Sequence, residues 1–237
     1  MRSVIPLLMT FLLFCNLSGR SQDVDNQLWI NYALTVPINK SLSYGGDIGF
    51  RGFISNYEWN RVLVRPAITY RFNKVFAVAG AVAWFRTANR DSLNVNEFRI
   101  HQDFNVKWPD FGFMEFFYRV RIEERFFFYQ EDLDNSFNVR LRGLIGIESQ
   151  DFTWFGSKRP IYFQSIYEAF RTLSYESAYE VFVNQVRLHF AFGHRIAQGF
   201  RYELHYIAQR SRLFSDTGLE TTQNIYRIRI YHRLGAN

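Results

Sequence analysis

Apolar and polar residues alternate with a period of two along most of the chain. In the segment 118–130, charged residues take every second position and apolar residues take most positions between them. The charged set is Arg119, Arg121, Glu123 and Arg125. A strict period of two predicts a β-strand with two unlike faces, because successive side chains point to opposite sides of a sheet. The same alternation recurs around residues 27–36, 42–51, 97–108, 142–148, 182–192, 200–210 and 225–233.

These segments are about 10–14 residues long, the length of a tilted strand that crosses a bilayer. Shorter polar breaks are expected near residues 37–40, 72–74, 108–112 and 193–199, and longer ones near 88–95, 130–136, 172–178 and 211–221. Short turns that alternate with longer loops are typical of a membrane barrel. The pattern therefore predicts an all-β protein, a single transmembrane antiparallel up-and-down β-barrel. We count eleven segments, and because bacterial single-chain barrels have even strand numbers we expect 10–12, with residues 150–160 as the place for a missed strand.

Composition supports a membrane environment. Aromatic residues make up 19% of the chain and charged residues 21%, and the mean hydropathy is only −0.19. A soluble protein would need a second layer to cover so many aromatic faces, and no helix is predicted that could provide one. In a barrel the aromatic face meets lipid and the charged face meets the lumen. Glu124 departs from this pattern on the lipid side, which we explain by a position at the headgroup level or by a β-bulge.

The first residues are typical of an export signal. Arg2 precedes an apolar run over residues 4–14, and the small residues Gly19 and Ser21 suit cleavage before Gln22. A lipoprotein signal that uses Cys15 is the weaker alternative, because Phe14 stands where such signals need a small residue. We therefore expect a signal peptide at 1–21 and an outer-membrane barrel at 22–237.

Removing the signal peptide also removes the single cysteine, so no disulfide framework is expected. It removes two of the 28 basic residues and none of the 22 acidic ones, which leaves a net charge of +4. This small surplus does not indicate a nucleic-acid partner.

The lumen of such a barrel should hold a network of charged side chains. We predict as its members Arg65, Glu97, Arg99, Glu115, Arg119, Arg121, Glu123, Arg125, Arg140, Arg142, Arg187, Glu203, Arg227 and Arg229. The same face is expected to carry Arg61, Asp103, Glu148 and Arg201. Arginine can bind carboxylate with two parallel hydrogen bonds, so the favoured interpretation is a salt-bridge core that fills the lumen. The alternative is an anion-selective constriction, because Arg outnumbers Glu.

Catalytic and metal chemistry is weakly indicated. His189, His205 and Glu203 are expected on lumen faces, but no serine stands at a spacing that would complete a triad. The acidic segment 130–136 lacks the glycine and the distal glutamate of a calcium loop. We expect no catalytic residues, no metal and no cofactor. Five aromatic residues are expected in interfacial girdles, namely Trp59, Tyr70, Trp84, Trp108 and Tyr231.

Four motifs together resemble one family. They are Leu28-Trp29, "RPAITYRF" at 65–72, "NEFRIHQ" at 96–102 and "RVRIEERF" at 119–126. In order and spacing they are similar to the bacterial outer-membrane barrels catalogued as domain of unknown function 2490, over essentially the whole mature chain. The resemblance implies an outer-membrane barrel and supplies no activity or site residues.

The expected function is that of a non-enzymatic outer-membrane barrel of a Gram-negative bacterium, with a structural or narrow-pore role. The alternatives are an anion- or small-solute-selective channel and a lipid-modifying enzyme. The expected partners are outer-membrane lipid, lipopolysaccharide and the barrel-assembly machinery.

Overall fold

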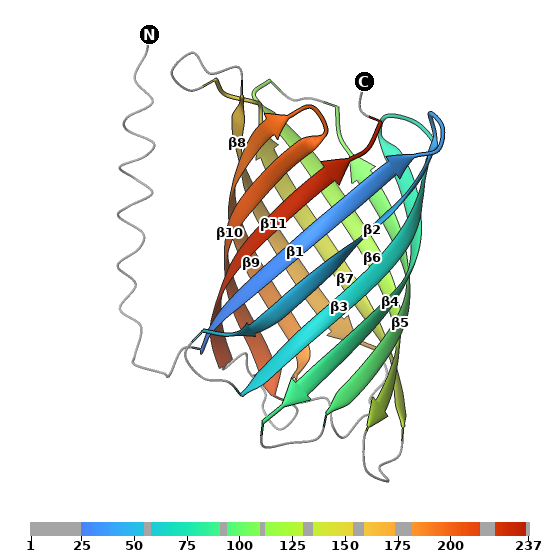
Figure 1. Ribbon diagram of the computed structural model, residues 1–237, viewed down its shortest axis with the longest axis vertical. Coiled ribbons are helices and arrows are strands. Elements are labelled where there is room, and N and C mark those ends of the chain that lie inside the picture. The colour runs from blue at the N-terminus through green and yellow to red at the C-terminus, as the bar shows by residue number, and fades with distance from the viewer. Residues whose placement is uncertain are drawn as a thin grey trace.

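The described residues form a closed barrel of eleven β-strands (Figure 1). The computed structural model describes residues 25–54, 58–90, 94–109, 112–129, 135–153, 159–173, 182–213 and 221–235, and the expected signal peptide lies outside them. The strands are β1 (Asp25–Pro37), β2 (Leu42–Phe53), β3 (Trp59–Arg71), β4 (Phe76–Asn89), β5 (Val95–Lys107), β6 (Met114–Tyr129), β7 (Ser136–Ser149), β8 (Ile161–Thr172), β9 (Phe182–Ala197), β10 (Phe200–Leu213) and β11 (Thr221–Arg233). Within the described ranges, no helix is long and apolar enough to cross a membrane.

The barrel is antiparallel except where it closes. Each strand pairs with its sequence neighbours, and β1 pairs with β11 in parallel, with Trp29 opposite Arg227. In an up-and-down barrel with an odd number of strands, the first and last strands run in the same direction, so a parallel pair is required for closure. The all-β barrel and the range of 10–12 strands are confirmed, and the antiparallel prediction holds for every pair except this one.

The two ends of the barrel differ in their connections. We call the end where β1 runs into β2 the turn end and the opposite end the loop end. At the turn end, Asn39 Oδ1 accepts hydrogen bonds from the backbone amides of Ser41 and Leu42 at 2.9 and 2.8 Å. In the same way, Asn73 Oδ1 accepts hydrogen bonds from the backbone amides of Val75 and Phe76, at 2.8 Å each. Both four-residue turns therefore use one asparagine to bind amides that the ladder leaves free.

Two expected breaks differ from the structure. The connection over 150–160 joins β7 to β8 at the turn end and is the longest of the ten, although short turns were expected there. Within its described part, Phe152 makes an isolated bridge to Ile161, so no twelfth strand forms there. The break expected at 193–199 is only two residues long, because β9 continues through Gly193 to Ala197.

The outer wall is apolar, and its exposed rings occur both near the two ends and midway along strands, as at Tyr167, Tyr206 and Tyr226. Exposed aliphatic side chains on this wall include Ile48, Val64, Ile68, Val82, Val120, Ile145 and Leu188. Exposed rings near the two ends include Tyr44, Phe50, Tyr70, Trp84, Phe104, Trp108 and Phe128. Two of the expected girdle residues are instead on the inner wall, because Trp59 shares its face with Arg61 and Tyr231 shares its face with Arg229. The girdle prediction is therefore wrong for Trp59 and Tyr231.

Glu124 stays on the outer wall without a bulge. It is half-buried and pairs in an unbroken ladder with Ile100 on β5 and Val139 on β7. The β-bulge that we considered for this position is therefore wrong. Phe126 and Phe128 lie beyond Glu124 toward the loop end of the same strand.

Candidate functional site

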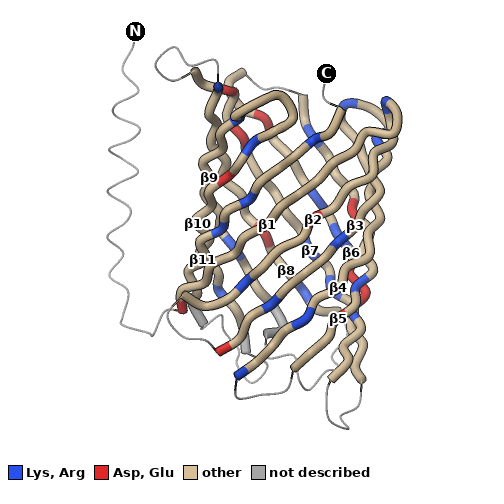
Figure 2. The backbone as a smooth tube through the Cα atoms, in the orientation of Figure 1, with Lys and Arg blue, Asp and Glu red and all other residues tan. Residues whose placement is uncertain are grey.

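The structure places the predicted lumen residues on the inner wall. Their positions alternate with those of the outer wall on β3, β5–β7 and β9–β11. Figure 2 shows basic residues on strands all around the barrel, with fewer acidic ones between them. Glu115 is separate from the buried set, since it pairs with the exposed Lys107 at the turn end.

Five charged side chains form a compact group in the loop half of the lumen, which we call the plug. They are Glu97, Arg99, Glu123, Arg125 and Arg140. Arg99 donates to both oxygens of Glu97 at 2.6 and 2.7 Å, and Arg125 donates to the same carboxylate at 2.6 Å. Each of these side chains is at most 9% exposed. Burial of this degree requires compensating pairs, and the plug supplies them.

Glu123 is the acidic centre of this arrangement. Its carboxylate accepts two hydrogen bonds from Arg140, at 2.5 and 2.8 Å. Arg142, Arg121 and Arg99 place further guanidinium nitrogens at 3.5, 3.6 and 3.9 Å. One carboxylate that is 1% exposed therefore compensates four cations.

Aromatic rings support the arginines of the plug. The Arg99 Cζ lies 3.9 Å from the Phe85 ring centroid, and the Arg125 Cζ lies 4.6 Å from that of Phe127. The Phe170 ring has Arg142, Arg187 and Arg140 within 4.5–5.2 Å. Cation–π contacts of this kind are strongest where water is excluded.

The remaining side of the loop half is filled by amide and apolar side chains. Gln209 donates to Gln223 at 2.6 Å, while Trp29 packs with Ile207 and Ile225. All five are at most 5% exposed. In the described part of the chain, the side chains of the plug and of this second group are thus buried.

A cavity of about 590 Å³, which we call the vestibule, extends from the turn end of the lumen to Trp29 and Arg51. It reaches the exposed residues Arg71 and Lys74 at the turn end. Small side chains on the wall leave this space, among them Ala33, Ala67, Ala77 and Ala79.

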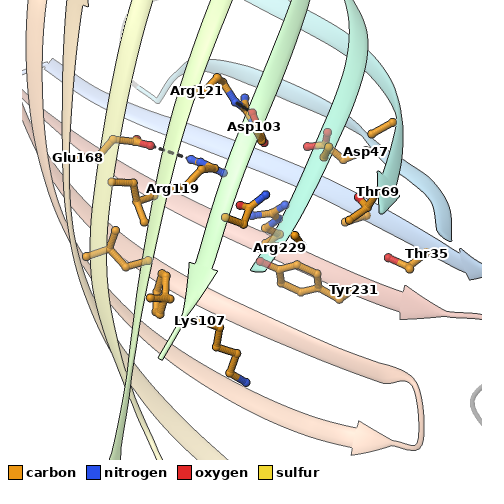
Figure 3. Close-up of a pocket in the computed structure, with 18 of the residues that line it drawn as sticks. Thr35, Asp47, Thr69, Asp103, Lys107, Arg119, Arg121, Glu168, Arg229 and Tyr231 are labelled. Atoms are coloured by element: carbon orange, nitrogen blue, oxygen red, sulfur yellow. Dashed lines mark hydrogen bonds and ion pairs between the residues drawn. The ribbon is translucent and has the colours of Figure 1, made fainter. Parts of the chain in front are cut away.

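Each acidic side chain of the vestibule already has basic partners. Asp47 binds Arg65 through both oxygens at 2.7 and 2.8 Å, and Asp103 binds Arg121 in the same way at 2.5 and 2.6 Å. Glu168 accepts from Arg142 at 2.6 Å and from Arg119 at 3.0 Å. Figure 3 shows the Arg121–Asp103 and Arg119–Glu168 pairs on one wall and Arg229 beside Tyr231.

Glu203 lies at the centre of a group of tyrosine, histidine and arginine side chains near the turn end. It accepts hydrogen bonds from the Tyr162 hydroxyl at 2.7 Å and the Tyr231 hydroxyl at 3.0 Å, and it lies 2.8 Å from His205 Nε2. Arg227 is 2.9 Å from His205 Nδ1, so His205 fits as a neutral imidazole that donates through Nε2 and accepts at Nδ1. Gly193 permits this group, because a side chain there would overlap the Tyr162 ring. The glycine that suggested a turn therefore makes room for an aromatic ring on the neighbouring strand.

Among the described residues, no serine hydroxyl is hydrogen-bonded to this group. His205 contacts Glu203 and Arg227. Ser211 is on the same strand, but its hydroxyl accepts a hydrogen bond from Gln209 at 3.2 Å and makes none to this group. His189 makes no hydrogen bond that we find in the described residues. Among those residues, no cluster of three potential metal ligands occurs either.

Sequence reasoning missed three important inner-wall residues. Glu168 was overlooked because it is the only charged residue on the inner face of the described part of β8, beside Tyr162, Ile166 and Phe170. Asp47 and Arg51 belong to the polar positions of the alternating segment 42–51, but they were not included in the predicted network. The signal that would have identified them is the register of β2 against β1 and β3, where Asp47 faces Arg65 and Arg51 faces Trp29.

Comparison with protein families finds one match. Residues 26–220 match the model of the family described as protein of unknown function (DUF2490). No curated protein and no solved structure matches the chain.

Proposed function

The chain belongs to the DUF2490 family of proteins of unknown function, and we propose that it is a non-enzymatic outer-membrane β-barrel whose lumen is closed by the plug. The family resemblance expected from the four sequence motifs is confirmed by the match. The proposed role is structural or that of a very narrow pore. The observation that carries the proposal is the contrast between an exposed apolar outer wall and a buried, charged inner wall.

The outer wall fits a bilayer better than water. Soluble monomers rarely expose contiguous apolar patches larger than a few hundred Å². A 13-residue strand such as β1 is about 43 Å long, and a tilt of about 40° gives a height of about 33 Å. This height matches the hydrocarbon core of a bilayer, which is about 30 Å thick.

The outer-wall charges support an orientation and a partner. Arg86, Arg171 and Arg210 are exposed within three residues of the loop end of their strands. At the extracellular surface they would meet the phosphates of lipopolysaccharide, with the turn end in the periplasm. Replacing Arg86 and Arg210 by Gln should reduce the lipopolysaccharide that co-purifies with the protein. Equal amounts on wild type and the double variant would contradict this placement.

The compartment gives a second expected result. Because residues 1–21 have the layout of a signal peptide, the mature protein should begin at Gln22 and sediment with the outer membrane. Mass spectrometry of the N-terminus in separated membrane fractions tests both points. An intact Met1, or a lipid on Cys15, would overturn the signal-peptide assignment.

The channel alternative rests on the excess of arginine, and proteoliposome swelling separates it from a closed barrel. A closed lumen predicts that vesicles with inserted protein take up neither small sugars nor small anions. Uptake of anions alone would favour the selective channel. The alternative of a lipid-modifying enzyme has weaker support. An altered lipid profile in a deletion strain would be the evidence in its favour.

A further inference from the structure

The vestibule carries more positive charge than the protein itself compensates. Among the residues that line it, twelve are Lys or Arg and four are Asp or Glu, an excess of eight positive charges. Each of the four carboxylates is bound by at least one arginine or histidine of the lumen. The plug, by contrast, has carboxylates at the centre of its cations. The excess is therefore located in a hollow part of the lumen that reaches the barrel end.

Two guanidinium groups of the vestibule have no acceptor among the described residues. Arg51 and Arg229 make no hydrogen bond or ion pair there, and the Nε of each is buried without a partner. Arg229 is held by its contact with the Tyr231 ring, whose centroid is 4.5 Å from the Arg229 Cζ. A third guanidinium, that of Arg227, donates to Nδ1 of the neutral His205 at 2.9 Å and to no carboxylate among the described residues. Buried donors of this kind are costly unless something accepts from them.

The strand register brings these three groups to one place. Trp29 of β1 is directly opposite Arg51 on β2 and Arg227 on β11, and Asn31 is directly opposite Arg229. The Trp29 ring also has Arg51 and Arg187 at 4.1 and 5.0 Å from its centroid. All four arginines line the vestibule.

Repulsion around Arg51 is not relieved by a carboxylate within ion-pair distance among the described residues. Arg51 is directly opposite Arg61 across the β2–β3 pair, and like charges in this position destabilise a sheet. The nearest acidic position on its own strand, Asp47, is taken by Arg65. A bound anion would supply the missing negative charge, since a guanidinium group can donate two parallel hydrogen bonds to the oxygens of a phosphate or a carboxylate.

We propose that the vestibule binds a small polyanion, a molecule with two or more phosphate or carboxylate groups, through Arg51, Arg227 and Arg229. The volume of about 590 Å³ is that of a small-molecule site and far exceeds the space needed by chloride. Three separate guanidinium groups favour a ligand with several anionic groups over one with a single charge. The ligand enters from the turn end, because the plug closes the other side.

The test is ligand binding by the full-length mature barrel refolded in a non-ionic detergent at low ionic strength. Pyrophosphate represents phosphates, citrate represents carboxylates, and glycerol is the neutral control. We expect pyrophosphate or citrate to bind in calorimetry and to raise the unfolding midpoint with concentration. Glycerol should do neither. The anion that binds more tightly identifies the ligand class.

Three variants locate the site. Arg51→Gln and Arg229→Gln should each weaken binding about tenfold, the loss expected for one charge-assisted hydrogen bond. Arg90→Gln, which removes the same charge from an exposed position outside the vestibule at the loop end, should leave the affinity unchanged. Neither lumen variant orphans a carboxylate, so both should fold and unfold at a midpoint no lower than that of ligand-free wild type.

Two results would overturn the inference. One is that wild type binds neither anion with a dissociation constant of about 1 mM or tighter. The other is that Arg51→Gln and Arg229→Gln bind as tightly as Arg90→Gln. The measurement is made in detergent, so it is independent of whether the barrel conducts. Conductance through the wild-type lumen would refute the plug and leave the binding result standing.

Discussion

Glu123→Ala is expected to lower the free energy of unfolding by about 3–5 kcal/mol, the cost of breaking a buried ion pair from one side. The structure gives the reason for an effect at the upper end of this range. The lost carboxylate has guanidinium nitrogens of four arginines within 3.9 Å, and two of those nitrogens, both on Arg140, are at 2.8 Å or less. Without it, these cations repel one another where water does not reach. Denaturant unfolding in one detergent, with the slope checked for constancy, measures the loss.

Glu124→Ala is the matched control for this prediction. It removes the same charge one position further along β6, from the outer wall. Glu123→Gln keeps the size of the side chain and should give a smaller loss than alanine. Glu123→Ala combined with Arg140→Met should recover part of the stability, because one orphaned cation is removed. If Glu123→Ala and Glu124→Ala shift the midpoint equally, the plug does not hold the charges together as described.

Val120→Arg is expected to cost about 2–4 kcal/mol in a bilayer, the penalty for arginine at the midplane of a barrel wall. Val120 is 49% exposed on the outer wall, six residues from the turn end of β6. Its neighbours across the two strand pairs are Phe104 and Gly143, so an arginine there finds no carboxylate. Folding into vesicles of known thickness, with Val120→Leu as the apolar control, measures the cost.

Val139→Arg should behave differently, although alternation alone predicts the same penalty. Val139 is directly opposite Glu124, so the new guanidinium can pair with that carboxylate. We therefore expect a smaller loss than for Val120→Arg. If Val120→Arg folds as stably as Val120→Leu, the outer wall does not face lipid.

The sequence predicted the walls of the barrel better than its closure. A period of two fixes every face of a strand once one residue is placed, so the sides assigned to Arg121, Glu123 and Val120 follow from alternation alone. Which side chains pair across two strands depends in addition on the register between those strands. The pairs Asp103–Arg121 and Glu123–Arg140 cross from one strand to the next, at offsets that alternation does not set.

The remaining features depend on long-range geometry. The parallel β1–β11 pair depends on the total strand number, which the unpatterned segment 150–160 left open. The Glu168 side chain binds arginines of β6, β7 and β9, although the inner face of its own strand carries no other charged residue in the described part of β8. The vestibule exists because the side chains around it are smaller than those that fill the rest of the lumen. The sequence of one strand taken alone does not reveal this difference in side-chain volume.

Planar-bilayer recording of refolded wild type beside Glu123→Ala tests the closed lumen most directly. Insertion is verified independently in both cases, by protease protection in vesicles of the same lipid. The account predicts that inserted wild type conducts weakly or not at all, and that Glu123→Ala, with a more positive lining, shows a larger current that prefers anions. A wild type that conducts strongly, together with an unchanged unfolding midpoint in the variant, would contradict the plug and favour a water-filled channel.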